Sequence, residues 1–276
     1  MNWSRAKTVM IVTFLILNLL LYLAVVKSHV PQTTVFTSED FTAFKKVLEE
    51  NDIFLSTSLP EKTPLLPLVK VKREIFDDNF VLDYFLKDMP YEKKGQNGEI
   101  IFKSGKISIK ITPFEFFFQE KDEKFLKMSL EDKEKYIKNF LNKYSLSEKD
   151  GKQVKVEQKN SGVLLEYKQF YGDYFIEDSF IEAEIFDNNF TVRKKWFESV
   201  IPEKDRKEIV SAIFAVLELV KIKAEGIYLD IEDVKLGYYF NWPNAVKGEA
   251  VPVWRIITNK GTYYINAYTG NLEKGE

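Results

Sequence analysis

An uncharged apolar run at residues 9–26 constrains this chain more than any other feature. As an α-helix rising about 1.5 Å per residue, the run would be about 27 Å long, close to the hydrocarbon thickness of a bilayer. Cleaved signal peptides usually carry a shorter apolar region, of about 7–15 residues, and a small-x-small cleavage site. Because Val25, Val26 and Lys27 follow Ala24, the sequence favours an uncleaved transmembrane anchor over a cleaved signal peptide.

The charges that flank the run predict its orientation. Arg5 and Lys7 precede it, whereas Lys27 is the only nearby cation after it. The positive-inside bias therefore keeps the N-terminus in the cytoplasm and places the rest of the chain outside the membrane. We predict a cytoplasmic tip and anchor over residues 1–27. Residues 28–37 are polar and contain Pro31, which indicates a short stalk.

Composition excludes several kinds of chemistry. The 276 residues include 40 basic and 42 acidic side chains, a net charge of −2, which argues against nucleic acid as a partner. The chain has no Cys, and its one His is His29. Thiol catalysis, disulfides, Ser-His-Asp catalysis and zinc sites rich in Cys or His therefore lack their residues. We expect no cofactor and no metal ion, and an enzyme of this composition would have to use carboxylates, Lys or Tyr.

Residues 38–128 predict a first α+β lobe. Ser38 is a good N-cap, and Phe41, Phe44 and Leu48 recur at helical spacing up to about Asn51. Three prolines in residues 59–67 predict an irregular loop. Alternating apolar and aromatic residues then predict strands over residues 68–76, 99–111 and 113–118, with residues 104–106 as the turn of one hairpin.

Residues 129–276 predict a second α+β lobe made of two units, 129–198 and 199–276. In each unit a helix precedes strands that short turns connect, which favours antiparallel sheets with packed helices. Ser129 is the expected N-cap of the first helix, which ends near Tyr144. Asp205 is the expected N-cap of the second helix. Residues 209–221 of this helix are apolar nearly all round, which predicts burial of most of its surface.

Four carboxylates on the strand predicted at residues 174–186 form a candidate catalytic site: Glu177, Asp178, Glu182 and Glu184. A carboxylate pair at the right separation could cleave glycosides. The interpretation favoured by the alternation is a partly solvated sheet face, and no looped ligand pattern supports a calcium site. Lysine-rich stretches such as residues 106–110 could contact anionic wall polymers, but interleaved acids favour an ordinary surface.

Asn18 is the unusual residue of the apolar run, because a carboxamide inside a bilayer needs hydrogen-bond partners. Phe14, Asn18 and Tyr22 are spaced four apart, and on a helix they share a face with Ile11 and Leu15. This stripe favours contact with a second transmembrane helix. The alternative is an amide that bonds within its own helix.

The two ends of the chain resemble the YycI (WalI) family of regulatory proteins from low-GC Gram-positive bacteria. Residues 1–8, with Trp3 and Ser4 before basic residues, are similar to that family's cytoplasmic start, and residues 14–18 are similar to its span. Residues 254–256 and 261–270 resemble its C-terminal hairpin, which is also similar to PepSY-type modules. Residues 59–127 match no motif of the family.

The resemblance implies a single-pass, non-catalytic accessory regulator of the sensor histidine kinase WalK (YycG). Such a protein acts with its sister protein YycH on signalling in cell-wall metabolism, and a homodimer or heterodimer is compatible with it. Transmembrane contacts carry much of the effect in the family, and Trp3 would lie at the cytoplasmic interface. Two alternatives remain open: an anchored ligand- or peptide-binding sensor that uses the PepSY-like unit, and a wall hydrolase that uses the carboxylates of residues 174–186.

Overall fold

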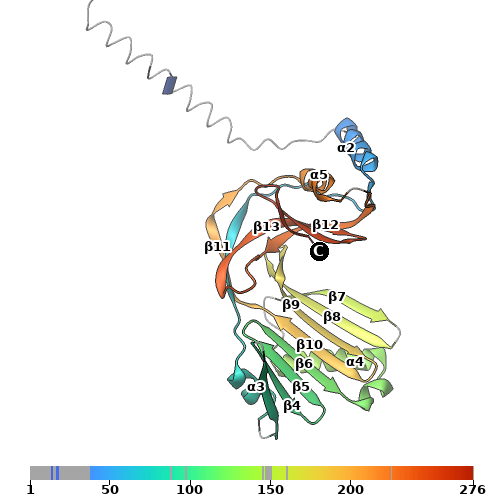
Figure 1. Ribbon diagram of the computed structural model, residues 1–276, viewed down its shortest axis with the longest axis vertical. Coiled ribbons are helices and arrows are strands. Elements are labelled where there is room, and N and C mark those ends of the chain that lie inside the picture. The colour runs from blue at the N-terminus through green and yellow to red at the C-terminus, as the bar shows by residue number, and fades with distance from the viewer. Residues whose placement is uncertain are drawn as a thin grey trace, which may run out of the picture. The chain divides into compact units, whose positions relative to one another are not determined.

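A computed structural model describes residues 14, 17, 18, 38–87, 89–96, 98–144, 146, 151–159, 161–224 and 226–275. Contacts divide the chain into two units, Met1–Lys46 and Val47–Glu276. The predicted α+β class is confirmed, since the described residues form mostly sheet with a few helices (Figure 1).

The first unit includes helical residues from the predicted anchor. Phe14, Leu17 and Asn18 are helical and exposed, whereas the rest of residues 9–26 and the predicted stalk at 28–37 lie outside the described residues. Across the part of the chain that is described, no helix combines the length and the hydropathy needed to cross a bilayer. Helix α2 (Ser38–Glu50) begins where Ser38 predicts it and continues into the second unit.

Within the described residues, the second unit contains a sheet of 15 strands. Its main order is β11-β2-β13-β12-β9-β10-β6-β5-β4-β3, and β1, β14, β15, β7 and β8 are attached beside this path. The strands are β1 (Ile53–Leu55), β2 (Leu66–Arg73), β3 (Glu92–Gln96), β4 (Glu99–Ser104), β5 (Ile107–Thr112), β6 (Glu115–Lys121), β7 (Gly151–Lys159), β8 (Gly162–Tyr171), β9 (Tyr174–Phe186), β10 (Asn189–Lys195), β11 (Phe197–Lys207), β12 (Leu229–Tyr239), β13 (Lys247–Thr258), β14 (Gly261–Asn266) and β15 (Leu272–Gly275). The helices are α3 (Asp78–Tyr84), the short 3₁₀ helix η1 (Glu123–Lys127), α4 (Leu130–Lys143) and α5 (Ala212–Ile222).

Two halves of this sheet meet where β9 pairs with β12. Phe175 and Ile176 pair in parallel with Gly237 and Tyr238, and we call these four residues the junction. The α4 half, residues 76–196, contains β3–β10 with α3 and α4 on one side of the junction (Figure 1). The α5 half, residues 47–75 and 197–275, contains β1, β2, β11–β15 and α5 on the other side.

Aromatic rings dominate the buried core of the α4 half. Alternation along β6 turns Phe116 and Phe118 inward, where Phe118 meets Phe140 of α4 with ring centroids 4.7 Å apart. Phe140 also contacts Phe190 of β10 edge-on at 4.8 Å. Each such ring removed from water contributes about 2–3 kcal/mol to stability. We call this cluster the aromatic core.

The predicted helix starts have different outcomes. The hydroxyl of Ser129 accepts a hydrogen bond from the N–H of Asp132 at 3.1 Å, so the predicted cap of α4 is confirmed. The predicted cap at Asp205 is wrong, because Asp205 lies within β11. Pairing of β11 with β2 keeps this segment extended, and α5 begins after Ser211, which accepts from the N–H of Phe214 at 3.2 Å.

The burial predicted for this second helix is confirmed on one side only. Helix α5 buries one side through Ala212, Ala215, Val216 and Leu219, whereas the ring of Phe214 is 43% exposed. Because exposed residues of α5 such as Phe214 are also apolar, the sequence does not show which side of the helix faces the sheet.

The sheet includes strands from both predicted lobes. β6 pairs with β10, and β2 pairs with β11 and β13, so residues of 38–128 and of 129–276 share hydrogen bonds. The division into lobes at 128/129, and into two units at 198/199, therefore stays a prediction from the sequence. The antiparallel order β7-β8-β9-β10 is confirmed, while β12 pairs in parallel with β1 and β9.

Candidate functional site

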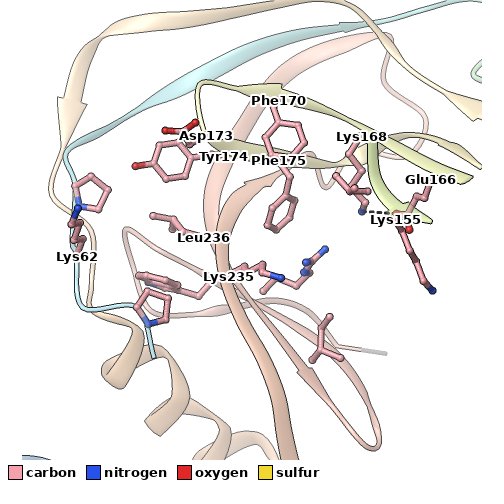
Figure 2. A pocket seen from close by; sticks show the side chains of 16 residues that line it. Lys62, Lys155, Glu166, Lys168, Phe170, Asp173, Tyr174, Phe175, Lys235 and Leu236 are labelled. Atoms are coloured by element: carbon pink, nitrogen blue, oxygen red, sulfur yellow. Dashed lines mark ion pairs between the residues drawn. The ribbon is translucent and has the colours of Figure 1, made fainter. Parts of the chain in front are cut away.

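A groove of about 800 Å³ lies beside the junction and is lined from both halves of the second unit (Figure 2). The α4 half contributes side chains of β7, β8 and β9, and the α5 half contributes β12, β13 and the loop after β1. The lining residues are Pro60, Lys62, Pro64, Val154, Lys155, Glu166, Lys168, Phe170, Asp173, Tyr174, Phe175, Lys235, Leu236, Trp254, Arg255 and Ile257.

The groove exists because one edge of β12 is only partly covered. β1 pairs with β12 at residues 229–231, and β9 pairs with it at Gly237 and Tyr238. Between these contacts no strand of the described residues pairs with the outer edge of residues 232–236. Pro60 and Pro64 lack backbone N–H groups, so the chain after β1 leaves the sheet as an irregular loop.

An ion-pair cluster holds the two halves together at this point. Glu177 of β9 accepts hydrogen bonds from Lys168 of β8 at 2.6 Å and from Arg255 of β13 at 3.0 Å. The guanidinium of Arg255 also lies over the ring of Phe175, 4.2 Å from its centroid. These ion pairs join β8 and β9 to β13. Burial and the nearby Glu177 carboxylate also raise the pKa of the Tyr264 hydroxyl.

Gly237 allows the close approach on which this cluster depends. A Cβ atom at Gly237 would lie 2.5 Å from the ring of Phe175, far inside the normal contact distance. Only glycine lets that ring pack directly on the backbone of β12, which positions Phe175 under Arg255.

The lining of the groove combines cations with aromatic rings. Five lining side chains are Lys or Arg and two are Glu or Asp. Figure 2 shows Lys62 and Lys155 at opposite ends, with Phe170 and Tyr174 between them. The side chains of Lys155 and Lys235 are 50% and 61% exposed. Such a surface suits a ligand that carries both negative charge and apolar groups.

Within the described residues, no group of three or more His, Asp or Glu side chains could hold a metal ion.

Three of the four carboxylates predicted on β9 lie near separate cations. Glu177 belongs to the cluster above, and Asp178 pairs with Arg73 at 2.5 Å. Glu182 lies 3.8 Å from Arg193, and burial raises the pKa of its carboxyl group. Glu184 is exposed. This arrangement supports the interpretation as a partly solvated, ion-paired sheet face rather than a catalytic pair.

The residues predicted to contact a partner helix are only partly described. Phe14 and Asn18 are helical and exposed, four residues apart. Trp3, Ile11, Leu15 and Tyr22 lie outside the described residues. Sequence reasoning missed the groove itself. Its one local signal was the glycine at position 237, directly before Tyr238 and Tyr239.

Comparisons with known proteins identify a family. A family model described as "YycI protein" matches residues 32–268. No curated protein matches the chain. Among solved structures, an uncharacterized protein from Eubacterium rectale is 11% identical, with a TM-score of 0.47, over 75% of this chain and 85% of that one. The C-terminal domain of YpeB from Bacillus megaterium is 15% identical, with a TM-score of 0.39, over 74% of this chain and 98% of that one.

Proposed function

Since the chain belongs to the YycI protein family, we propose that it is a membrane-anchored, non-catalytic accessory regulator of the WalK/WalR (YycG/YycF) two-component system. The family match over residues 32–268 carries this proposal, because it covers nearly all of the folded second unit. The kinase WalK and the sister protein YycH are the proposed partners, and cell-wall metabolism is the proposed output.

Residues 9–26 act in this proposal as a single transmembrane helix with a cytoplasmic N-terminus. Ile11, Phe14, Leu15, Asn18 and Tyr22 form its contact stripe, and Trp3 fixes its depth at the cytoplasmic interface. The amide of Asn18 adds about 1 kcal/mol of interhelical hydrogen bonding. The helical, exposed positions of Phe14 and Asn18 support this stripe.

An accessory helix changes kinase output only if it binds the signalling states with different affinity. A difference of about 1–3 kcal/mol is typical of such coupling. The second unit, with its proposed PepSY-like C-terminal part, then lies outside the cell and contacts the extracytoplasmic parts of its partners. The paired carboxylates of β9 support a role without catalysis.

Crosslinking from position 18 tests the proposal. A photo-crosslinking residue at position 18 of the full chain, in native membranes, should capture the kinase or YycH. The same residue at position 17 is the control, because it projects about 100° away around the helix and should capture them far less. Equal capture from both positions, or capture of neither protein, would contradict the proposed contact stripe.

Substitution of Asn18 measures the strength of the contact. Asn18→Leu should weaken co-purification with the kinase about fivefold and change the expression of its target genes, whereas Asn18→Gln keeps an amide and should preserve both. Unchanged co-purification and unchanged expression with Asn18→Leu would count against the amide's role.

A further inference from the structure

The outer edge of β12 offers hydrogen-bonding groups that no strand in the described part of the chain uses. Residues 232–236 are in strand conformation. On their inner edge they pair with β13, where Asp233 lies opposite Ile257 and Leu236 lies opposite Trp254. Backbone N–H and C=O groups alternate sides along a strand, so about half of those in this stretch point away from β13. Exposed strand edges of this kind accept further strands.

The opening has the size of one short strand. It is bounded by β1, where the N–H of Ser56 donates to the C=O of Ile231 at 3.0 Å, and by the junction at Gly237. Five residues at about 3.3 Å each span roughly 16 Å. Lys235 and Leu236 are consecutive, so their side chains point to opposite faces of the sheet, yet both line the groove. The groove therefore runs along the edge of the strand and not over one face of the sheet.

Charge favours an acidic occupant. Lys62 has no ion-pair or hydrogen-bond partner among the described residues, and the exposed pairs Lys155–Glu157 and Lys235–Asp233 measure 2.6 and 3.0 Å. Exposed pairs of this kind contribute less than about 1 kcal/mol, so these lysines can exchange partners for carboxylates of a ligand. Apolar side chains on alternate positions of an extended chain would meet Phe170 and Tyr174.

The strand edge also distinguishes a polypeptide from an anionic polymer. A polypeptide backbone presents alternating donors and acceptors at the spacing of β12, whereas the phosphate groups of an anionic polymer present acceptors alone. We therefore propose that the groove binds an extended, acidic segment of a partner protein, which adds to the open edge of β12 as an extra strand. This site goes beyond the regulatory role proposed above and does not depend on the transmembrane contact.

A binding measurement tests the proposal directly. The probe is a fluorescein-labelled peptide of four Val-Glu repeats, added to the full chain in detergent micelles and followed by fluorescence anisotropy. A Val-Lys peptide of equal length should bind at least tenfold more weakly, because its charges oppose those of the groove. A Val-Glu peptide N-methylated at alternate residues should also bind at least tenfold more weakly, because it cannot pair along β12.

Variants of the chain locate the binding site. Lys235→Glu should weaken the Val-Glu peptide about five- to tenfold, and Lys204→Glu, an exposed control on β11, should leave its affinity unchanged. Circular dichroism confirms that both variants are folded.

Several results would overturn the proposal. One is the absence of saturable binding by the Val-Glu peptide, and another is binding that Lys235→Glu leaves unchanged. Equal affinity for the N-methylated peptide, together with competition by poly(glycerol phosphate), would assign the groove to anionic polymers. A dimer that Lys235→Glu dissociates would assign the edge to a second copy of this chain.

Discussion

The aromatic core of the α4 half and the junction beside the groove are stabilised in different ways. In the core, Phe118, Phe140 and Phe190 contact one another through buried rings. Beside the junction, ion pairs add to the apolar packing of Ile176 and Tyr238. Arg255 reaches Glu177, and Arg73 reaches Asp178.

Buried polar side chains add hydrogen bonds between the two halves. Gln169 of β8 donates to the C=O of Phe197 at 3.0 Å and accepts from the hydroxyl of Ser179 at 2.8 Å. Ring packing tolerates small shifts, whereas hydrogen-bonded ion pairs need defined geometry and lose much when one partner is removed. The core therefore supplies stability, and the junction fixes the arrangement of the two halves that shapes the groove.

The largest expected effect comes from truncation in the core. Phe118→Ala should lower the free energy of unfolding by about 3–5 kcal/mol, because it leaves a cavity among rings that cannot fully collapse. Urea denaturation measures this change. Phe186→Ala, at a ring that is 45% exposed on the same half, is the control and should cost less than about 1 kcal/mol. Similar costs for both would remove the distinction between the core and the surface.

Breaking an ion pair at the junction should rank second. Asp178→Ala leaves the guanidinium of Arg73, which is 3% exposed, without its carboxylate, and should cost about 3 kcal/mol. Arg73→Met combined with Asp178→Leu should recover much of that loss, because no buried charge remains. A double variant as unstable as Asp178→Ala would show that the charges themselves hold the halves together.

A smaller effect is expected where the junction needs a glycine. Gly237→Ala should displace the ring of Phe175 and cost about 1–3 kcal/mol, with faster hydrogen exchange around Gly237. Gly95→Ala is a matched control, since a Cβ atom at Gly95 has no neighbour within 4 Å. Exchange that speeds up throughout the α4 half instead would indicate that the junction does not behave as a separate region.

The smallest expected effect concerns the start of α5. Ser211→Ala removes the observed N-cap and should cost about 1 kcal/mol, measured by urea denaturation. Asp205→Ala, at the cap predicted from the sequence, should change stability by less than about 0.5 kcal/mol, because Asp205 is exposed on β11. A larger loss of stability for Asp205→Ala than for Ser211→Ala would support the helix start predicted from the sequence.

Much of the local structure could be predicted from the sequence. Both ends of β9 match the predicted residues 174–186, because its alternating side chains begin after a turn where Gly172 takes a positive φ of 60°. Helix α3 was missed since it has only seven residues, although Asp77 caps it by accepting from the N–H of Phe80. Asp205 was misread because long-range pairing outweighed a local capping pattern.

The groove could not be predicted in the same way. Its lining comes from five strands and a loop, and the parallel contact of β9 with β12 involves residues about 60 positions apart. Periodicity reports which side of a strand is buried, but it does not report which strands are neighbours. The sequence marked Glu177 as a candidate acid, and only the structure shows its two cationic partners.

The pairing of β2 has a consequence for the biosynthesis of the chain. Its partners, β11 and β13, begin only at Phe197 and Lys247, so a polypeptide that emerges amino end first presents β2 long before either neighbour is available. The α4 half can assemble from contiguous sequence in the meantime, while β2 stays exposed to aggregation. A nascent chain halted before residue 247 would therefore carry a finished α4 half and an incomplete α5 half, which a quality-control protease could recognise.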